Sequence, residues 1–296
     1  MKMQYIDRLQ VRKRINFRLR LNSILKYVFL GATLSGLVVL AILLIRTVSQ
    51  GFAWIDWNFI TGHLSMDPEK AGIMGAILGT FWLMLVVVFF TLFLGMGAAI
   101  YLELYAKKGR IHSLIQTNIA NLAGVPSIVY GILGLTVFVR LMDFGSTVLA
   151  GGLTLSLLVL PIVIVSSQEA LRAVPQTLGE ASYGLGASKW QTIKSIILPT
   201  ALPSILTGSI LALSRAIGET APLVVLGIPA LLIPFPGGFM DRFTALPMQI
   251  YYWTLDAALV EEYANLAAAS IIILLLMLFI LNSIAIYIRN KFQHRF

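Results

Sequence analysis

Two oppositely charged side chains, Arg215 and Glu219, lie in an otherwise uncharged run of about residues 200 to 228. A charge at the centre of a bilayer costs about 2.5 to 3.5 kcal/mol, so membrane segments keep charges that are paired or used. The i,i+4 spacing allows the two side chains to form an ion pair on one helix face. A guanidinium fork also matches two oxygens of an oxyanion. The pair therefore predicts either an anion contact, in which Glu219 orients Arg215 or accepts a proton, or an ion pair that only stabilises subunit packing.

The residues after this pair are expected to interrupt the helix. Gly218 and Thr220 precede Pro222, which lacks a backbone donor, so the chain is predicted to break here and direct backbone N–H groups at an anion. Ser127, beside Pro126, is a further candidate for substrate contact, although such a serine more often bonds its own helix backbone. The predicted substrate-pathway residues are Arg215, Glu219, Thr220 and Ser127.

A polar island, 180-EASYGLGASKWQTIKSIILP-199, interrupts the apolar sequence. Pro175 and a capping-box spacing at Thr177 and Glu180 predict a short helix over about 176 to 184. Gly184 and Gly186 permit a sharp turn, and a second capping box, Ser188 to Gln191, predicts a second short helix at an angle to the first. Trp190, Ile193 and Ile197 are expected on one face of that second helix. The pattern alone leaves open an amphipathic loop that rests on lipid headgroups.

The elements that position these residues are predicted to be membrane-spanning helices. The chain has 296 residues, 58% of them hydrophobic and 12% charged, a composition typical of integral membrane proteins. A crossing needs about 20 apolar residues. Six candidate spans follow: Tyr27 to Ile45, Ala71 to Leu102, Ile111 to Val139, Phe144 to Gln168, about 200 to 228, and Tyr263 to Ile288. The second and third runs are too long for one crossing, so 71 to about 77 and 111 to about 122 are predicted to be interfacial lead-ins.

Lysine and arginine accumulate in short cytoplasmic loops, which orients the spans. The stretches 1–26, 103–110, 169–199 and 289–296 carry 17 basic and 4 acidic residues, and the alternate loops carry 4 basic and 8 acidic residues. Both termini and the polar island are therefore predicted to be cytoplasmic. The prolines and glycines of 229-PALLIPFPGGFM-240 predict an outer re-entrant or surface segment, and 251-YYW-253 is expected to lie at the membrane interface.

The expected division of the chain is a first part of 1–70, with a cytoplasmic tail, the span 27–45 and an outer loop, then a membrane domain of 71–288 and a tail of 289–296. The excess of 17 basic over 4 acidic residues on one side fits anionic lipid, and no nucleic acid partner is expected. The three histidines are far apart and the chain has no cysteine, so neither a metal site nor catalytic residues are expected.

The polar island resembles the EAA loop of ABC importer permeases, in which Glu-Ala-Ala is followed by three residues, Gly, nine residues and Ile-x-Leu-Pro. Ser182 replaces the second alanine of that pattern. The resemblance implies an all-α type I permease fold and a loop that docks into a separate ATPase. The implied ATPase-coupling residues are Glu180, Ala181, Gly186, Trp190, Ile196, Leu198 and Pro199.

Four segments sharpen the resemblance: 124-GVPSIVYG-131, 160-LPIVIVSSQEALRAVP-175, 211-LALSRAIGETAPL-223 and 243-FTALPMQIYYWT-254. Together they are similar to PstA-type permease subunits of phosphate importers. That similarity implies a PstC-type permease partner, a homodimeric PstB-type ATPase, an extracytoplasmic phosphate-binding protein and a bacterial or archaeal inner membrane. No cofactor is expected on this chain, since it lacks a G-x-x-x-x-G-K-[ST] phosphate loop, and ATP and Mg²⁺ are expected on the ATPase.

Three other classes of function stay open. A permease for another oxyanion, such as molybdate, sulfate or phosphonate, would carry a similar Arg-Gly-Glu neighbourhood. An ion-coupled secondary transporter would work without an ATPase. A membrane-embedded enzyme is disfavoured because the spans contain no acid–base or metal constellation.

Overall fold

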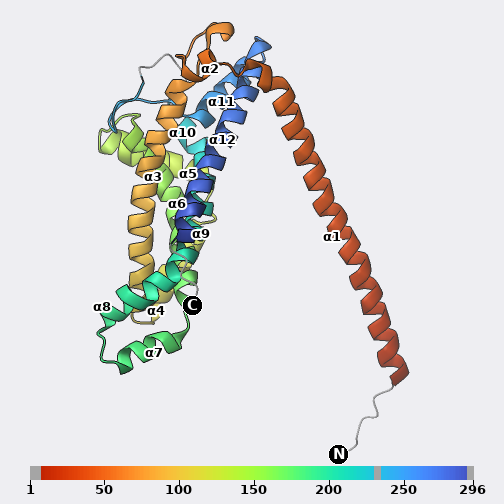
Figure 1. The fold of residues 1–296 in the computed structure, drawn as a ribbon, viewed down its shortest axis with the longest axis vertical. Helices are drawn as coiled ribbons and strands as arrows, with labels where there is room; N and C mark the ends of the chain where they lie inside the picture. Colours follow the sequence, from red (N-terminus) through yellow and green to blue (C-terminus); the bar gives the residue numbers. More distant parts are fainter. Residues whose placement is uncertain (1–7, 230–234, 292–296) are drawn as a thin grey trace, which may run out of the picture. The chain divides into compact units, whose positions relative to one another are not determined.

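The computed structural model describes residues 8–229 and 235–291, with side chains from residue 15 onward (Figure 1). These residues are almost all helical, and one isolated β-bridge joins Thr147 to Arg242. The chain divides into two units, residues 1–49 and 50–296. Part of the 229–240 segment, residues 230–234, lies outside the described residues.

The first unit is a single long helix, α1 (Arg8–Gly51), whose last two residues belong to the second unit. At 1.5 Å per residue its 44 residues extend about 66 Å, roughly twice the thickness of a bilayer core. The apolar part includes the predicted span 27–45, and the basic N-terminal part continues the same helix. The predicted span therefore exists, but it is only the middle of a longer helix.

The second unit begins with short helices and then alternates long and short ones. In order these are η1 (Phe52–Trp54), α2 (Trp57–Thr61), η2 (Pro68–Lys70), α3 (Met74–Ile100), η3 (Tyr101–Tyr105), α4 (Arg110–Leu122), α5 (Ser127–Gly134), η4 (Leu135–Leu141), α6 (Val148–Arg172), α7 (Gln176–Gly184), α8 (Lys189–Thr192), η5 (Ile193–Ile197), α9 (Leu198–Ile217), α10 (Ala221–Val225), α11 (Leu246–Asp256) and α12 (Glu262–Lys291). Three of them, η3, η4 and η5, are π-helical turns at the ends of longer helices.

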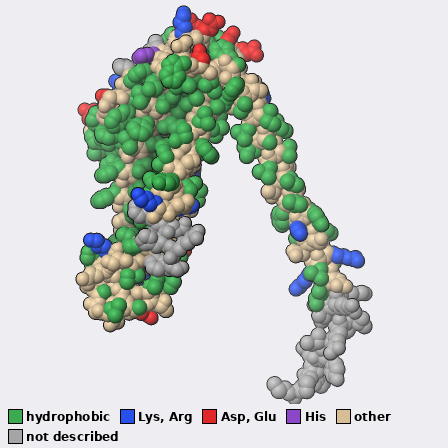
Figure 2. Space-filling model, viewed as in Figure 1, with side chains coloured by type: hydrophobic (Ala, Val, Ile, Leu, Met, Phe, Trp, Pro, Cys, Tyr) green, Lys and Arg blue, Asp and Glu red, His purple; other side chains and the backbone are tan. Residues whose placement is uncertain are grey.

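Close packing of α3, α6 and α9 forms the centre of this unit. Val163 of α6 packs over Gly95 of α3, and Val86 of α3 packs over Gly152 of α6, so small residues let the two helix backbones approach. Apolar side chains cover the flanks of the unit, and charged side chains gather toward its ends (Figure 2). That distribution of apolar and charged side chains is the one expected of a protein that spans a bilayer.

Within residues 8–229 and 235–291, five helices are long and apolar enough to cross a membrane, and a sixth crossing results if α4 and the segment 127–141 count as one bent pair. The two halves of that pair meet at 102°, so the predicted third span, 111–139, is not a continuous helix. The expected lead-in over 111 to about 122 corresponds to α4. The predicted fifth span, 200–228, is wrong at its end, because α9 stops at Ile217.

A helix that the sequence reading missed, α11, packs against α12 at the outer end. It buries Trp253 to 3% exposure beside Phe59, so this residue of the predicted interfacial 251-YYW-253 triplet is a core residue instead. Pro247 in the first turn of α11 is a helix-start signal that could have revealed it. The 243-FTALP-247 segment likewise packs: Phe243, Ala245 and Leu246 have no exposed surface, and the Leu246 N–H donates to Thr80 Oγ1 at 2.8 Å.

Candidate functional site

The predicted coupling loop folds as two helices around a sharp turn. α7 ends at Gly184, and Gly186 follows with φ +83°, a left-handed conformation that glycine adopts without a steric penalty. Ser188 then caps α8: its Oγ accepts from the Gln191 N–H at 3.4 Å, and the Gln191 side chain accepts from the Ser188 N–H at 2.8 Å. The predicted turn and the second capping box are confirmed.

A buried hydroxyl pair connects the two helices. Ser182 Oγ lies 2.9 Å from Thr192 Oγ1, and both residues are at most 5% exposed. Ser182 occupies the position at which the EAA pattern has alanine. The Ser182 hydroxyl forms a hydrogen bond across the turn with Thr192. Serine in place of alanine therefore adds a contact between α7 and α8.

Three details of the prediction were wrong. Thr177 lies within α7, which begins after Pro175 and has no side-chain cap, so the first capping box is not formed. The second helix is not separate, because α8, η5 and α9 form one continuous stretch, Lys189–Ile217. Trp190 is 60% exposed and Ile193 is 1% exposed, so these residues do not share a face. The segment η5 begins at Ile193 and packs against α7, so Ile193 is covered while Trp190, one helical turn earlier, stays exposed.

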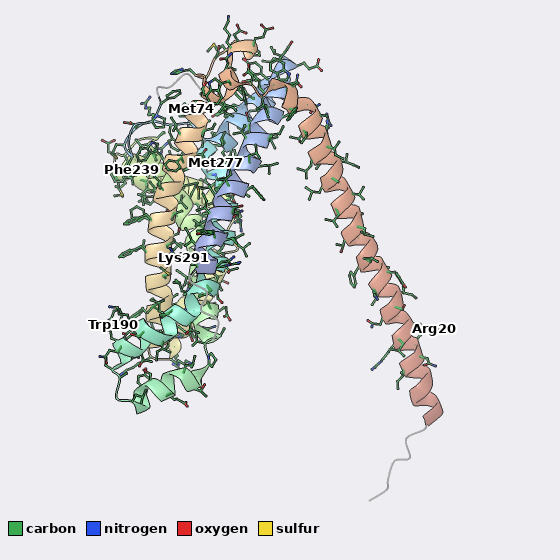
Figure 3. The ribbon with its side chains drawn as sticks, viewed as in Figure 1. Arg20, Met74, Trp190, Phe239, Met277 and Lys291 are labelled. Carbon is green, nitrogen blue, oxygen red and sulfur yellow. The ribbon has the colours of Figure 1, made fainter. Side chains whose placement is uncertain are left out.

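The predicted coupling residues divide into an exposed group and a packed group. Glu180, Ala181, Gly186 and Trp190 are exposed, whereas Ile196, Leu198 and Pro199 are half-buried. Tyr183 and Leu185 are also exposed, at 47% and 90%, and had not been predicted as coupling residues. Trp190 and Met74 lie at opposite ends of the second unit (Figure 3). A protein partner at this end would meet exposed charged and aromatic side chains rather than the apolar flank.

The predicted ion pair is formed at the end of α9. Arg215 Nε donates to Glu219 Oε1 at 3.1 Å, and the two side chains are 52% and 16% exposed. Glu219 lies beyond the last residue of α9, so the pair spans the helix end instead of lying on one continuous helix face. Among the described residues, Nε makes the only hydrogen bond of the Arg215 side chain, which leaves Nη1 and Nη2 as available donors.

The predicted interruption is present between α9 and α10. α9 ends at Ile217, and Thr220 precedes the short α10, with Pro222 in its first turn. α10 packs against α5, whose first residue is Ser127. A Cβ on Gly131 would lie 2.8 Å from Pro222 Cα, so only glycine permits this approach of α5 to α10. The structure thus joins the 124–131 and 218–223 segments, while no hydrogen bond among the described residues links Ser127 or Thr220 to Arg215.

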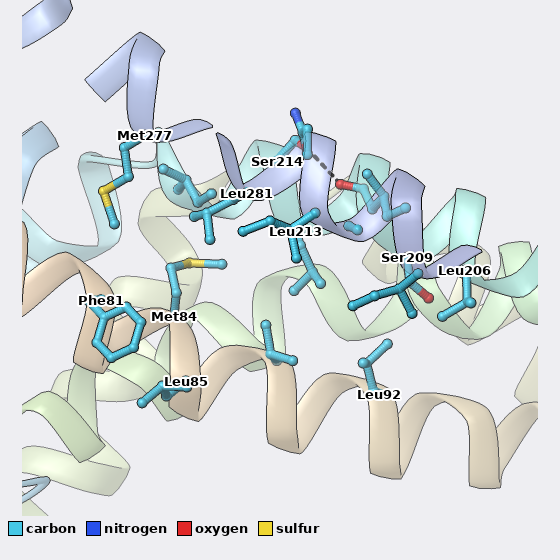
Figure 4. Close-up of a pocket in the computed structure, with 17 residues that line it drawn as sticks. Phe81, Met84, Leu85, Leu92, Leu206, Ser209, Leu213, Ser214, Met277 and Leu281 are labelled. Carbon is cyan, nitrogen blue, oxygen red and sulfur yellow. Dashed lines mark hydrogen bonds between the residues drawn. The ribbon is translucent and has the colours of Figure 1, made fainter. Parts of the chain in front are cut away.

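An apolar groove of about 330 Å³ lies beside this site, between α3, α9 and α12 (Figure 4). Ser214, the neighbour of Arg215, lines it and places its Oγ 2.7 Å from Asn282 Oδ1 of α12. This contact fixes the end of α9 against the last span.

Sequence reasoning missed several buried polar side chains on α6 and α9. Gly208 of α9 packs on Ser166, and the neighbouring Ser167, Gln168 and Ser209 are at most 2% exposed. Ser167 Oγ, Gln168 Nε2 and Ser209 Oγ have no hydrogen-bond partner within the described residues. The Ser-Ser-Gln sequence at 166–168, inside an otherwise apolar span, could have indicated these buried polar residues. Among the described residues, no group of three or more His, Asp or Glu could hold a metal ion.

Several known permease proteins are similar to this chain in sequence. The chain is 33% identical over 286 residues to the phosphate transport system permease protein PstA of Yersinia pestis, a match covering 96% of this chain and 95% of the relative. It is 35% identical to PstA of Mycobacterium leprae, covering 82% and 79%. A probable ABC transporter permease of Bacillus subtilis, YqgI, is 36% identical over 60% of each chain, so this chain spans less than two thirds of that relative.

Solved structures show the same fold at low sequence identity. A bacterial ABC transporter involved in import of the acidic polysaccharide alginate matches with a TM-score of 0.66 at 15% identity, covering 95% of this chain and all of that one. An inward-facing MetNI methionine ABC transporter matches with a TM-score of 0.59 at 16% identity, covering 75% and 96%. The fold is that of a multi-pass permease subunit, which works with a further permease subunit and with separate ATPase subunits.

The family model described as binding-protein-dependent transport system inner membrane component matches residues 92–295. These residues include the coupling loop, the Arg215–Glu219 pair and α10 to α12. The chain belongs to this family of permease subunits.

Proposed function

We propose that this chain is the permease subunit of an ATP-driven importer of inorganic phosphate and forms half of the translocation pathway. It pairs with a PstC-type permease, docks on a homodimeric PstB-type ATPase that binds ATP and Mg²⁺, and receives phosphate from an extracytoplasmic binding protein. The assembly lies in a bacterial or archaeal inner membrane. The full-length similarity to PstA of Yersinia pestis carries the proposal.

The geometry at Arg215 supports phosphate as cargo. The side chain is half exposed, and its Nε is held by Glu219, so the guanidinium is oriented while its two Nη groups remain available to an oxyanion. Arginine keeps its charge at every physiological pH, whereas phosphate exists as a mixture of singly and doubly charged forms. Glu219, at 16% exposure, offers a carboxylate oxygen as hydrogen-bond acceptor to the hydroxyl of the singly charged form.

Exposed residues of α7 and α8 support the coupling role. Glu180 and Tyr183 are exposed on α7 and Trp190 is exposed on α8. The buried Ser182–Thr192 contact joins these two helices, and Trp190 lies at the end of the unit opposite Met74 (Figure 3). Two helices held in this way move together when a partner displaces either of them, which is a rigid-body transition.

Radiolabelled phosphate uptake into cells tests the proposal, with this chain deleted or re-expressed and other phosphate carriers disabled. We expect deletion to abolish uptake under phosphate limitation and re-expression to restore it. Unchanged uptake on deletion would reject phosphate as the cargo.

A permease for another oxyanion is the second candidate, because an Arg-Gly-Glu neighbourhood would also bind molybdate, sulfate or phosphonate. Excess of each anion in the same uptake assay separates the two: only unlabelled phosphate should compete. An ion-coupled transporter would instead keep its uptake when ATP is depleted and the membrane potential is maintained.

A further inference from the structure

The coupling loop contacts one segment, η3 at the end of α3, near both of its ends. Arg172 is the last residue of α6 and Lys189 the first of α8, so the two cations bracket the loop that contains α7. Arg172 donates from Nε and Nη2 to Glu103 Oε2, each at 2.8 Å. Lys189 Nζ lies 4.6 Å from the ring centroid of Tyr105, a cation–π distance. Glu103 and Tyr105 both belong to η3, the π-helical end of α3.

The Arg172–Glu103 contact is more protected than a surface ion pair. Glu103 is 13% exposed and Arg172 is 43% exposed. Arg172 Nη1 also donates to Glu169 Oε1 at 2.8 Å, so one guanidinium joins two carboxylates from two helices. A planar fork bound in this way has a defined orientation, and its removal leaves the shielded Glu103 without a partner.

The segment η3 also contacts other parts of the cytoplasmic end. His112 Nε2 of α4 lies 3.1 Å from the Leu102 carbonyl oxygen. Leu102 is itself buried in a cluster with Leu171 of α6 and Ile205 of α9. A displacement of η3 would therefore reach α4, α6 and α9 as well as α3. Single π-helical turns inside longer helices are found frequently at functional sites.

One cavity places the attachment next to the coupling residue Glu180. Glu103, Arg172, Glu180 and Tyr183 line a cavity of about 520 Å³ between α7 and the ends of α3 and α6. The cavity is therefore bordered both by α7 and by the Arg172–Glu103 ion pair. An ATPase side chain that enters it lies next to both.

We propose that Arg172–Glu103 and Lys189–Tyr105 form a clamp that makes α7 and η3 move as one body. The clamp gives the ATPase a direct mechanical connection to α3, in addition to the covalent connections from the loop to α6 and α9. Its four residues are positioning residues, since they act through the spans and need not touch the cargo. The inference rests on the proposed coupling to an ATPase but does not depend on phosphate being the cargo.

Spin-label distance measurements on the assembled permease–ATPase complex test the clamp, because the chain has no native cysteine. Labels at Tyr101→Cys on η3 and Leu185→Cys after α7 use side chains that are 62% and 90% exposed. Distances are recorded without nucleotide and with ATP and vanadate. The test variants are Glu103→Gln, Arg172→Gln and their double variant, and Lys189→Gln removes the second attachment. The control variant Asp67→Asn with Lys70→Gln breaks an ion pair of equal length, 2.8 Å, on the outer loop.

With the clamp intact, we expect the main distance between the labels to keep its position in both nucleotide states. In Glu103→Gln and Arg172→Gln it should shift and broaden when vanadate traps the nucleotide. The double variant should be no worse than Arg172→Gln alone, because Glu103→Gln removes no further interaction once Arg172 is replaced. The control should behave like the native chain. In proteoliposomes the clamp variants should hydrolyse ATP but import about threefold less phosphate per ATP, a loss of coupling typical of residues between two sites.

A label distance that changes with nucleotide in the native chain, or that stays constant in every clamp variant, would overturn the clamp. A complex that hydrolyses ATP but imports no phosphate would reject the proposed cargo, and the distance measurement would still decide the clamp. The two proposals therefore fail separately.

Discussion

Arg215 is the side chain whose chemistry decides the cargo. We expect Arg215→Lys to assemble normally and to lose phosphate uptake about tenfold or more, because lysine lacks the bidentate fork and holds its charge at a single point. Uptake of radiolabelled phosphate, normalised to the amount of assembled complex, measures the effect. Lys70→Gln, which removes a cation that is 79% exposed in the outer loop, serves as the matched control. Near-native uptake by Arg215→Lys would assign the pair to packing alone.

Gly131 is the residue whose size fixes the contact between α5 and α10. Gly131→Ala should destabilise the folded subunit by about 1 to 3 kcal/mol, since its Cβ would lie 2.8 Å from Pro222 Cα and 3.0 Å from Val225 Cβ. Gly97→Ala is the matched control, because a Cβ at that helical position meets nothing within 4 Å. Thermal unfolding of the two variants in detergent compares them. Equal stability would show that α10 moves aside at little cost.

Local chemistry explains which residues could be predicted from the sequence. The capping box at Ser188 and Gln191 and the interruption before Pro222 depend on residues only a few positions apart, so both were readable. The Arg172–Glu103 bond joins residues 69 positions apart, and neither belongs to the EAA pattern. No local spacing reports such a contact, which arises only when α3 and α6 pack.

At the scale of elements, the Ser182–Thr192 contact determines whether α7 and α8 act as a pair. We expect Ser182→Ala or Thr192→Val alone to cost about 1 to 3 kcal/mol, because each leaves a buried hydroxyl without a partner. The double variant should cost less than the sum of the two, since both partners are then apolar. Limited proteolysis of the loop and the ATPase rate of the complex together measure the effect. Additive losses would show that the two hydroxyls act independently.

The elements that escaped prediction share a physical cause. Ile193, the first residue of η5, is buried because η5 packs against α7, while Trp190 stays exposed, and no local sequence signal reports that contact. α11 has only 11 residues, and its apolar and aromatic composition also suits a membrane interface. Its burial comes from α12, which the sequence does not place beside it.

At the scale of the whole molecule, the charge distribution predicts that the coupling loop and the α11–α12 loop lie on opposite sides of the membrane. Single cysteines at Leu185 and Leu259 test this in the naturally cysteine-free chain, because both side chains are highly exposed, at 90% and 88%. An impermeant thiol reagent added to intact spheroplasts should label Leu259→Cys and should label Leu185→Cys only after lysis. Labelling of both from outside would contradict the assigned orientation.

The central claim is that this chain forms an ATP-driven phosphate pathway with Arg215 in it. Phosphate import into proteoliposomes that contain this chain, its permease partner and the ATPase, supplied with the binding protein, tests the claim most directly. We expect import that requires ATP, is not driven by an ion gradient, and is lost in Arg215→Lys while ATP hydrolysis continues. Import that proceeds without ATP, or that is unchanged in Arg215→Lys, would contradict this account.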